Sequence, residues 1–397
     1  MKLNYRPEID GLRAIAVLSV VIYHAKFSLF GLDLFEGGFL GVDIFFVISG
    51  YLITKIIFIE IKSTGKFSFM KFYERRIRRI LPALFFITFS TLVAGYYILL
   101  PHSFLEFAQS ILYQLGFISN FYFWKYYHFS YMSENALMLP FLHTWSLSVE
   151  EQFYVLFPII LIAIIKYLKK YLAILIISGI LISLIIADYF SPIYSSLTFY
   201  MLPFRGWELL VGSLIAYLEV FNQKKISIKN KFIREGLLII SFLIIILFVF
   251  FFNSKLHHPS INTFFLILSV SIIIWLADQN SLVTKFLSIK LLTGIGLISY
   301  SLYLWHYPLF SFSRHVYGSI FEEMIFLKLL IILLSIILSI FSFQFIEKTF
   351  RKKSFSFRKV NIYILASIFI LFLANFTVVQ NRGYEKRLYL SEYQKEK

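Results

Sequence analysis

Long apolar runs separated by short polar stretches make up most of the 397-residue chain. A helix needs about 20 residues to cross a bilayer, and the runs of about this length predict an all-α, polytopic bundle of transmembrane helices. We predict eleven spans, at residues 9–26, 38–59, 80–100, 144–166, 171–188, 200–220, 236–252, 260–277, 291–312, 324–346 and 360–380. Residues 103–125 mix Glu106 and Asn120 with aromatic side chains, which favours an amphipathic helix at the membrane interface over a twelfth span.

Lysine and arginine residues gather in alternate loops of this pattern. With the N-terminus in the cytoplasm, 26 of them fall on the inner side and only four in the outer loops before the last span. The positive-inside rule therefore predicts a cell-membrane protein, in the inner or cytoplasmic membrane, with its N-terminus inside and its C-terminus outside. We divide the chain into a membrane domain of ten spans, 1–350, and a region 351–397 that holds a basic cytoplasmic linker, the eleventh span and a short outer tail.

Composition narrows the classes of function. The chain is 59% hydrophobic, with a mean hydropathy of +0.78 and a net charge of +16. Because the positive charge lies in loops between apolar runs, we interpret it as a topology signal and expect the lipid bilayer, not nucleic acid, as the partner. There are no cysteines, which excludes thiolate metal sites and a cysteine nucleophile. We expect no metal site and no permanently bound cofactor.

The first span carries two ionisable residues, Arg13 and His24. Eleven residues correspond to about three helical turns and ~16 Å of rise, so the two side chains share one helix face. Ionisable groups inside a membrane helix are costly and are by default candidates for function. A cation near one membrane surface and a base near the other suit a long, phosphate-bearing substrate. The alternative is a signal-anchor helix with a structural histidine.

A second candidate is the basic segment before the third span. It contains four arginines within five residues: Arg75, Arg76, Arg78 and Arg79. Pro82 follows them and suits the first turn of a helix. Arginines three residues apart share a helix face, and guanidinium groups bind phosphates bidentately. The alternative is a purely topological positive cluster.

A third candidate is the segment 142–158, with His143 at the expected outer surface. Ser146 or Ser148 could cap the following helix, with Glu150 or Glu151 in its first turns. Capping accounts for at most one of these carboxylates, so we expect the other to pair with a histidine or an arginine. A carboxylate beside His24 would fix the tautomer of the imidazole and raise its basicity.

Two weaker segments follow. Arg205 and Glu208 are three residues apart on one predicted helix and can pair with each other. Tyr303 and His306 lie in the outer half of the ninth span, where aromatic residues commonly form an interfacial belt. That belt is the alternative to a functional role for this pair.

Six of the motifs, in this order along the chain, resemble acyltransferase family 3, the bacterial integral-membrane O-acyltransferases that modify cell-surface glycans. The similar segments are DGLRAIAVLSVVIYHA, GGFLGVDIFFVISGYLIT, RRIRRILPA, HTWSLSVEEQFY, RGWELLVG and ISYSLYLWHYPL. The resemblance implies a cytoplasmic acyl-CoA donor, usually acetyl-CoA, as co-substrate and a carbohydrate or lipid-linked glycan acceptor outside. It also implies that Arg13, His24 and the Arg-x-x-Arg positions are essential.

The sequence thus predicts a membrane O-acyltransferase. We expect the arginines to bind the donor, and Glu150 or Glu151 to orient His24. His24 is either a general base or forms an acyl-imidazole, and His143, Tyr303 and His306 lie on the acceptor side. Longer relatives continue into an extracytoplasmic esterase-like domain of the SGNH type. Only 17 residues follow Gln380 here, so we expect the acceptor to meet the membrane domain alone or a separate partner. The rival class is a transporter or flippase of a polar or lipid-linked solute.

Overall fold

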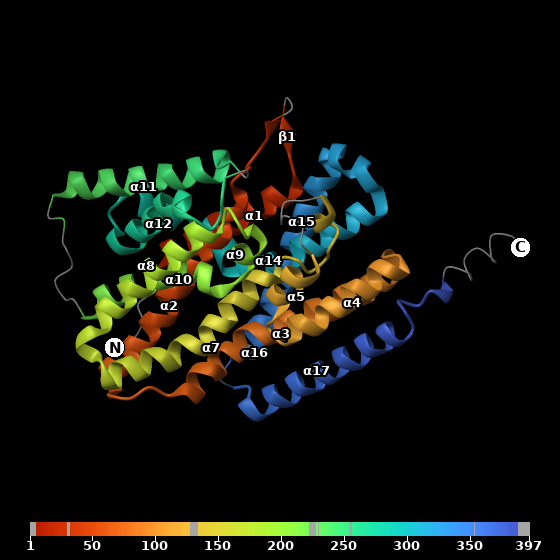
Figure 1. Ribbon diagram of the computed structural model, residues 1–397, viewed down its shortest axis with the longest axis horizontal. Helices are drawn as coiled ribbons and strands as arrows, with labels where there is room; N and C mark the ends of the chain where they lie inside the picture. Colours follow the sequence, from red (N-terminus) through yellow and green to blue (C-terminus); the bar gives the residue numbers. More distant parts are fainter. Residues whose placement is uncertain are drawn as a thin grey trace, which may run out of the picture. The chain divides into compact units, whose positions relative to one another are not determined.

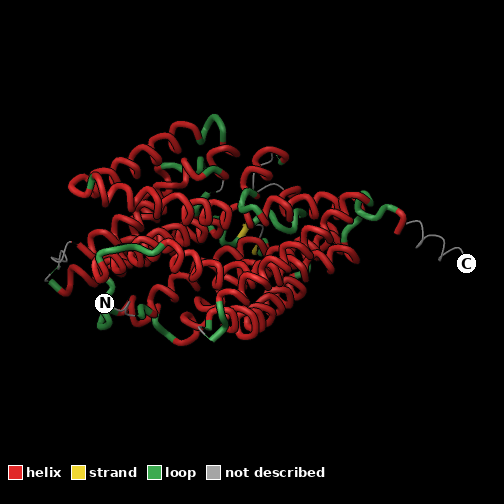
Figure 2. Tube along the Cα trace, turned by 90° about the horizontal axis from the view of Figure 1, so that it is seen from below, coloured by secondary structure: helices red, strands yellow, loops and turns green. Residues whose placement is uncertain are grey.

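The structure is a computed structural model that describes residues 5–29, 32–127, 134–221, 228, 230–253, 256–352 and 354–387. Helices dominate these ranges (Figure 2). The strands found in them are the two-residue pair β1 (Ser28–Leu29) and β2 (Leu32–Asp33), which is antiparallel. The predicted all-α class is therefore confirmed.

Seven helical segments within the described residues are long and apolar enough to cross a membrane. They are η1–α2 (Gly38–Leu40, Gly41–Thr64), α3 (Phe69–Ile98), α7 (Thr144–Tyr167), η2–α8 (Lys169–Tyr171, Leu172–Phe190), α11 (Lys231–Phe251), α15–η5–α16 (Ile325–Phe341, Ser342–Glu347, Lys348–Arg351) and α17 (Phe357–Gln380). The other four predicted spans correspond to helices that are shorter or more polar. These are α1 (Pro7–Ala25), α10 (Leu202–Phe221), η3–α12 (Ile261–Thr263, Phe264–Leu276) and α14 (Lys290–Tyr317). The chain is a multi-pass membrane protein, while the count of eleven and the orientation stay predictions.

The segment expected at the interface forms two separate helices, α4 (Pro101–Leu115) and α5 (Ser119–Tyr126). With 15 residues, α4 is about 22 Å long, which is too short to cross a hydrocarbon core of ~30 Å. This length agrees with the choice not to count residues 103–125 as a span. The remaining short helices are α6 (Glu134–Leu137), α9 (Ser195–Tyr200), α13 (Leu282–Leu287) and η4 (Gly318–Glu323).

The chain forms two compact units. Unit 1 comprises residues 1–67 and 149–300, and unit 2 comprises residues 68–148 and 301–397. Both α7 and α14 therefore contribute residues to each unit. These units group residues by their contacts, whereas the predicted boundary at residue 350 divides the chain by its membrane spans. That boundary stays a prediction.

Close packing of α2 against α10 forms the centre of unit 1, and α8 also packs against α10 (Figure 1). The contact depends on two glycines that let the backbones approach, as small residues do in membrane helix pairs. A Cβ on Gly50 would lie 1.9 Å from the carbonyl oxygen of Leu209, and one on Gly212 would lie 2.1 Å from that of Val47. Any side chain at either position would push the two helices apart.

The long helix α3 organises unit 2, in which α17 packs mainly against α3 and α4 (Figure 1). Ser68 caps α3, its hydroxyl accepting a hydrogen bond from the backbone N–H of Lys71. The prediction that Pro82 lies in the first turn is wrong, because α3 begins at Phe69 and Pro82 is inside it. The basic segment is itself helical and extends the apolar span towards its N-terminus. The four arginines are thus fixed on a helix surface.

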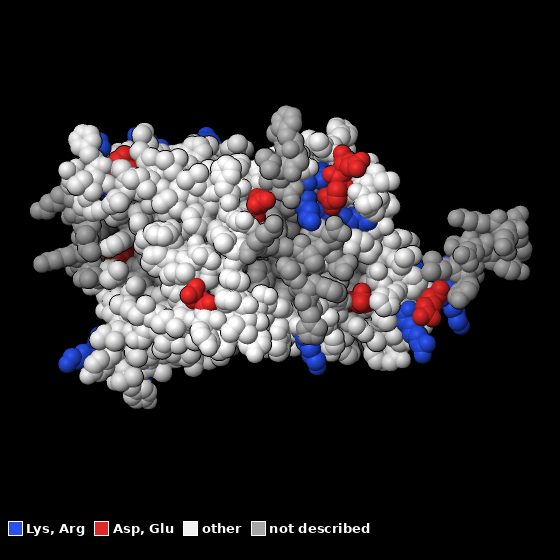
Figure 3. Space-filling view, turned by 45° about the horizontal axis from the view of Figure 1, so that its top comes forward, with Lys and Arg blue, Asp and Glu red and all other residues white. Residues whose placement is uncertain are grey.

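Charged side chains are sparse on the face shown in Figure 3, where they form a few small groups on an otherwise uncharged surface. Large apolar side chains are exposed along α8, α11, α15 and α17. In water such a surface would be an aggregation hazard. It is the surface expected where helices meet lipid tails.

Candidate functional site

Helix α1 carries Arg13 and His24 on one continuous run of helical backbone in unit 1, as predicted. Pro7 begins the helix, and Glu8 and Asp10 lie in its first turn, where carboxylates interact favourably with the helix dipole. Arg13 Nη1 lies 3.0 Å from Asp10 Oδ1. His24, only 2% exposed, lies in the last turn, where its ring meets that of Tyr23 edge to face at 5.2 Å. The helix therefore holds a buried imidazole and a paired guanidinium at positions separated by about 16 Å of helical rise.

The alternative for this segment, in which Ser146 or Ser148 caps the helix, does not fit the structure. Helix α7 begins at Thr144, so both carboxylates lie in its second turn, beyond the reach of its first N–H groups. Ser146 and Ser148 make other contacts. The hydroxyl of Ser146 donates to the carbonyl of His143, and that of Ser148 accepts from the backbone N–H of Ser119.

Glu150 instead interacts with α2 in unit 1. Its Oε1 accepts a hydrogen bond of 2.7 Å from the hydroxyl of Ser49, and its Oε2 lies 3.4 Å from the hydroxyl of Tyr154. Its expected role beside His24 stays a prediction, as does that of Glu151.

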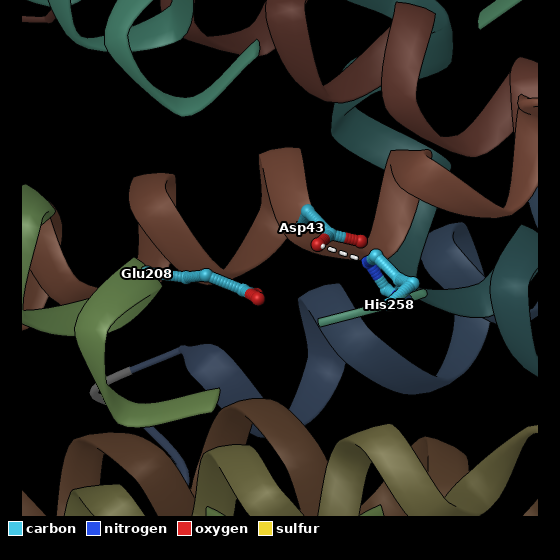
Figure 4. A group of neighbouring side chains, drawn as sticks. All are labelled: Asp43, Glu208 and His258. Atoms are coloured by element: carbon cyan, nitrogen blue, oxygen red, sulfur yellow. Dashed lines mark hydrogen bonds and ion pairs between the residues drawn. The ribbon is translucent and has the colours of Figure 1, made fainter. Parts of the chain in front are cut away.

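A buried ionic cluster in unit 1 includes two residues that the sequence analysis did not single out, Asp43 of α2 and His258 of the loop after α11. Arg205 Nη1 lies 2.9 Å from Glu208 Oε1 and 3.1 Å from Asp43 Oδ1, which confirms the predicted Arg205–Glu208 pair. His258 Nε2 lies 2.8 Å from Asp43 Oδ1 (Figure 4). All four side chains are at least nine-tenths buried.

The contacts within this cluster limit its ability to bind a metal ion. Asp43, Glu208 and His258 bring three potential metal-ligand atoms within 4.8 Å of one another. Arg205 Nη1 already lies near one atom of each, 3.0 Å from His258 Nε2. Its guanidinium thus takes the place that a metal ion would need. Burial lowers the pKa of His258, although Asp43 opposes this effect, so a neutral ring that donates from Nε2 to Asp43 fits the geometry.

A second network in unit 1 ties the start of α1 to α2 and α10. The hydroxyl of Tyr51 accepts hydrogen bonds from Arg6 Nη1 and Lys55 Nζ, both at 2.6 Å, and donates to Glu219 Oε2 at 2.6 Å. Lys55 Nζ also lies 2.9 Å from Glu219 Oε1. These residues and the ionic cluster were detectable by the argument applied to His24, because Asp43 and Lys55 are charged residues inside a predicted span.

The four arginines of α3, in unit 2, have different environments. Arg78 is buried, pairs with Glu74 at 2.9 Å, and donates from Nη1 to the backbone carbonyls of Phe350 and Phe355. Arg76 stacks on the ring of Phe72, with 5.7 Å from its guanidinium carbon to the ring centroid. Arg75 is exposed and Arg79 half-buried. Arg78 therefore holds the backbone around residues 350–355.

The three residues expected on the acceptor side lie together in unit 2. The ring of His143 is 5.2 Å from that of Tyr303 and 5.5 Å from that of His306, and it stacks on Tyr307 at 5.0 Å. The hydroxyl of Tyr303 donates to the backbone carbonyl of His143 and lies 2.7 Å from the hydroxyl of Ser146. His143 is fully buried, and neither of its ring nitrogens has a hydrogen-bond partner among the described residues. Burial lowers its pKa well below the ordinary value, so the ring is neutral at pH 7.

Comparison with known proteins assigns the chain to a family. The family model described as "Acyltransferase domain" matches residues 6–345. The chain belongs to acyltransferase family 3. That match includes α1, the α3 arginines, the ionic cluster and the His143 group. The resemblance identified from six short motifs is thereby confirmed.

Two curated relatives of this chain are named O-acetyltransferases. O-acetyltransferase OatA of Staphylococcus aureus strain NCTC 8325 is 34% identical over 363 residues, which cover 89% of this chain and 58% of the relative. A putative O-acetyltransferase of strain MSSA476 is 36% identical over 368 residues, with the same coverage. The chain thus spans less than two thirds of the length of these relatives. No solved structure matches it.

Proposed function

We propose that this protein transfers an acyl group, acetyl in the first instance, from cytoplasmic acyl-CoA to a hydroxyl of a glycan outside the cell membrane. One observation carries the proposal: α1, within the region matched to the family, holds a buried imidazole and an arginine on one helix face. The names of the relatives support acetyl as the acyl group and oxygen as the acceptor atom.

In the proposed reaction, the acceptor oxygen attacks the thioester carbonyl while His24 takes the hydroxyl proton. An ester C–O bond forms, the C–S bond breaks, and the CoA thiolate leaves and is protonated. In the second route, His24 first accepts the acyl group on a ring nitrogen and then passes it to the hydroxyl. Both routes require a neutral imidazole.

The donor is proposed to meet the arginines of α3 through its phosphates. Arg78 already binds two backbone carbonyls and Glu74, so it is the least suited of the four arginines to bind the donor phosphates. Arg76 and Arg79 are three residues apart and share a face. Replacing either with alanine removes charge-assisted hydrogen bonds and is expected to weaken acetyl-CoA binding by about 10- to 150-fold.

Purified protein incubated with labelled acetyl-CoA and a panel of surface glycans tests the proposal. The expected result is label on the glycan together with release of free CoA thiol. The variants Arg76→Ala and Arg79→Ala should need a higher acetyl-CoA concentration for the same rate of transfer. Lys66→Ala, which changes an exposed cation in the turn before α3, should behave like wild type. Transport of a labelled solute without CoA release would instead identify the transporter class.

A further inference from the structure

A buried carboxylate, Glu347, follows directly after the tenth predicted span in unit 2, and the proposed chemistry does not use it. Glu347 ends the π-helical segment η5, and its side chain is fully buried. Its Oε2 pairs with Nη2 of Arg351, one turn further along, whose side chain is 34% exposed. Its Oε1 accepts a hydrogen bond of 2.6 Å from the hydroxyl of Ser301 in α14. An ion pair alone would not need a second helix, so this contact couples Glu347 to α14.

A second hydrogen bond joins the same two segments one turn away. The indole Nε1–H of Trp305 donates to the hydroxyl of Ser342, at 2.9 Å. Ser301 and Trp305 are four residues apart on α14 and share a face, whereas Ser342 and Glu347 are five apart. On a regular α-helix, five residues correspond to about 140° of net rotation. A π-helix pairs residues i and i+5, so η5 brings Ser342 and Glu347 onto one face, towards the two donors of α14.

Both hydrogen bonds are buried, which makes them strong constraints on α14. Ser301, Ser342 and Glu347 are at most 1% exposed, and Trp305 is 8% exposed. A hydrogen bond to a carboxylate is about twice as strong as one between neutral groups, and loss of one buried partner leaves the other unsatisfied. These contacts therefore hold α14 against η5 at one rotation about its own axis.

The opposite face of α14 carries the aromatic residues around His143. Tyr303, His306 and Tyr307 lie about 140–240° around the helix from Ser301. Their ring centroids are 5.0 to 5.5 Å from that of His143. The hydroxyl of Tyr303 also donates to the backbone carbonyl of His143, at 2.9 Å. A rotation of α14 would thus move all three rings relative to His143.

We propose that Glu347 is a positioning residue for the acceptor: through Ser301 it fixes the rotation of α14, and thereby the place of Tyr303 and His306 beside His143. This inference rests on the proposed function, with the His143 group on the acceptor side of the reaction. A misplacement of about 1 Å can cost about 10²-fold in rate, so a carboxylate that touches no substrate can still control transfer. The rival role is a purely structural ion pair with Arg351.

NMR of the full-length protein in detergent, with isotope-labelled histidine, tests the link without a transfer assay. The chain has eight histidines, and the signal of His143 is the one that disappears in His143→Phe. Because aromatic rings surround this imidazole, its chemical shift should move in Glu347→Ala and in Ser301→Ala. Ser335→Ala, the matched control, should leave it in place, because this buried serine of α15 donates to the carbonyl of Ile331 in its own helix. An unmoved signal in Glu347→Ala would overturn the proposal, whether or not the protein acetylates a glycan.

Steady-state kinetics with acetyl-CoA and a glycan acceptor separate positioning from structural support. Glu347→Ala should lower kcat/KM for the glycan by about 10- to 100-fold, while acetyl-CoA affinity is unchanged because Arg76 and Arg79 are intact. Glu347→Gln keeps an oxygen for the Ser301 hydroxyl and should recover most of this loss, although it gives up the ion pair with Arg351. Normal glycan kcat/KM per folded molecule in Glu347→Ala, with a loss of stability alone, would make the carboxylate structural and overturn the proposal.

A double-mutant cycle shows whether the effect passes through His143. Residues that act as a unit have non-additive effects, so Glu347→Ala should lower glycan kcat/KM little further when His143→Phe is already present. With Arg76→Ala, at the proposed donor site, the two fold-losses should multiply. Losses that also multiply with His143→Phe would overturn this inference and leave the proposed function standing. Absence of transfer by wild type would overturn the proposed function, and the histidine signal would still decide the link to α14.

Discussion

The ionic cluster of unit 1 and the His143 group of unit 2 bury polar groups in different ways. The cluster in unit 1 buries charges and pairs them: Arg205 lies 3.1 Å from Asp43 and 2.9 Å from Glu208, and in the same unit Lys55 lies 2.9 Å from Glu219. The His143 group of unit 2 buries neutral rings and hydroxyls, and His143 has no hydrogen-bond partner for its ring among the described residues. Paired charges fix helices relative to one another, because loss of one partner strands the other. A neutral group with open nitrogens is better suited to meet a substrate.

The largest effect on the free energy of unfolding is expected at Arg205. Arg205→Ala leaves Asp43 and Glu208 buried without their cation and should lower the free energy of unfolding by about 3–5 kcal/mol. The matched control is Arg234→Ala, which breaks a pair with Asp278 at 2.9 Å whose side chains are 25% and 34% exposed. Exposed pairs contribute about 0–1 kcal/mol. Denaturant unfolding in detergent gives both values, and equal losses would refute a stabilising role for the cluster.

Two glycine substitutions in unit 1 should change the stability of the protein by an intermediate amount, in opposite directions. Gly212→Ala puts a methyl group against the backbone of α2 and should destabilise the protein by about 1–3 kcal/mol. Gly236, in α11, has nothing within 4 Å of the added Cβ, so Gly236→Ala should stabilise by about 0.5–1 kcal/mol. Thermal unfolding of the two variants should shift in opposite directions. Shifts in the same direction would contradict the close approach of α2 and α10.

Replacing His143 should separate stability from activity. His143→Phe keeps a flat ring and removes two buried nitrogens, so the free energy of unfolding should be unchanged or rise by about 1 kcal/mol. Acyl transfer should nevertheless fall if His143 meets the acceptor. The comparison needs unfolding and transfer assays on the same preparation. A drop in stability with normal transfer per folded molecule would make His143 a structural residue.

The smallest effect on stability concerns pH and the ion pairs of Glu322, in η4 of unit 2. Burial tends to raise the pKa of Glu322, but Arg314 and Lys328 hold it below its ordinary value. A carboxyl with a depressed folded-state pKa stabilises the protein above its unfolded pKa, near 4.3, and this contribution is lost as the pH falls through the folded value. Acidification should therefore destabilise wild type more than Glu322→Gln. A parallel pH dependence of the two melting temperatures would refute this contribution.

Much of the fold was predictable because each apolar run has the length of a membrane span, and every predicted span corresponds to a helix. The residues at which α3 and α7 begin were not predictable from the sequence. Arginine and the HTWS segment have no strong helix-breaking character, so α3 extends back to Phe69 and α7 to Thr144. Spacing was enough for pairs on one helix, such as Arg205 with Glu208. The contacts among Arg205, Asp43 and His258 join residues 53 to 215 positions apart, which no local pattern encodes.

The central claim is that His24 performs the chemistry of acyl transfer. The most direct test compares wild type, His24→Gln and the control His257→Gln, which changes an exposed histidine in the same way. Each purified protein is assayed for acetyl-CoA binding and for CoA release with a glycan acceptor. Since general base catalysis contributes about 10²–10⁴-fold, His24→Gln should lose that much turnover. Its donor affinity should be intact, because Arg13 and His24 are ~16 Å apart, and His257→Gln should match wild type. Near-wild-type turnover in His24→Gln would contradict the account.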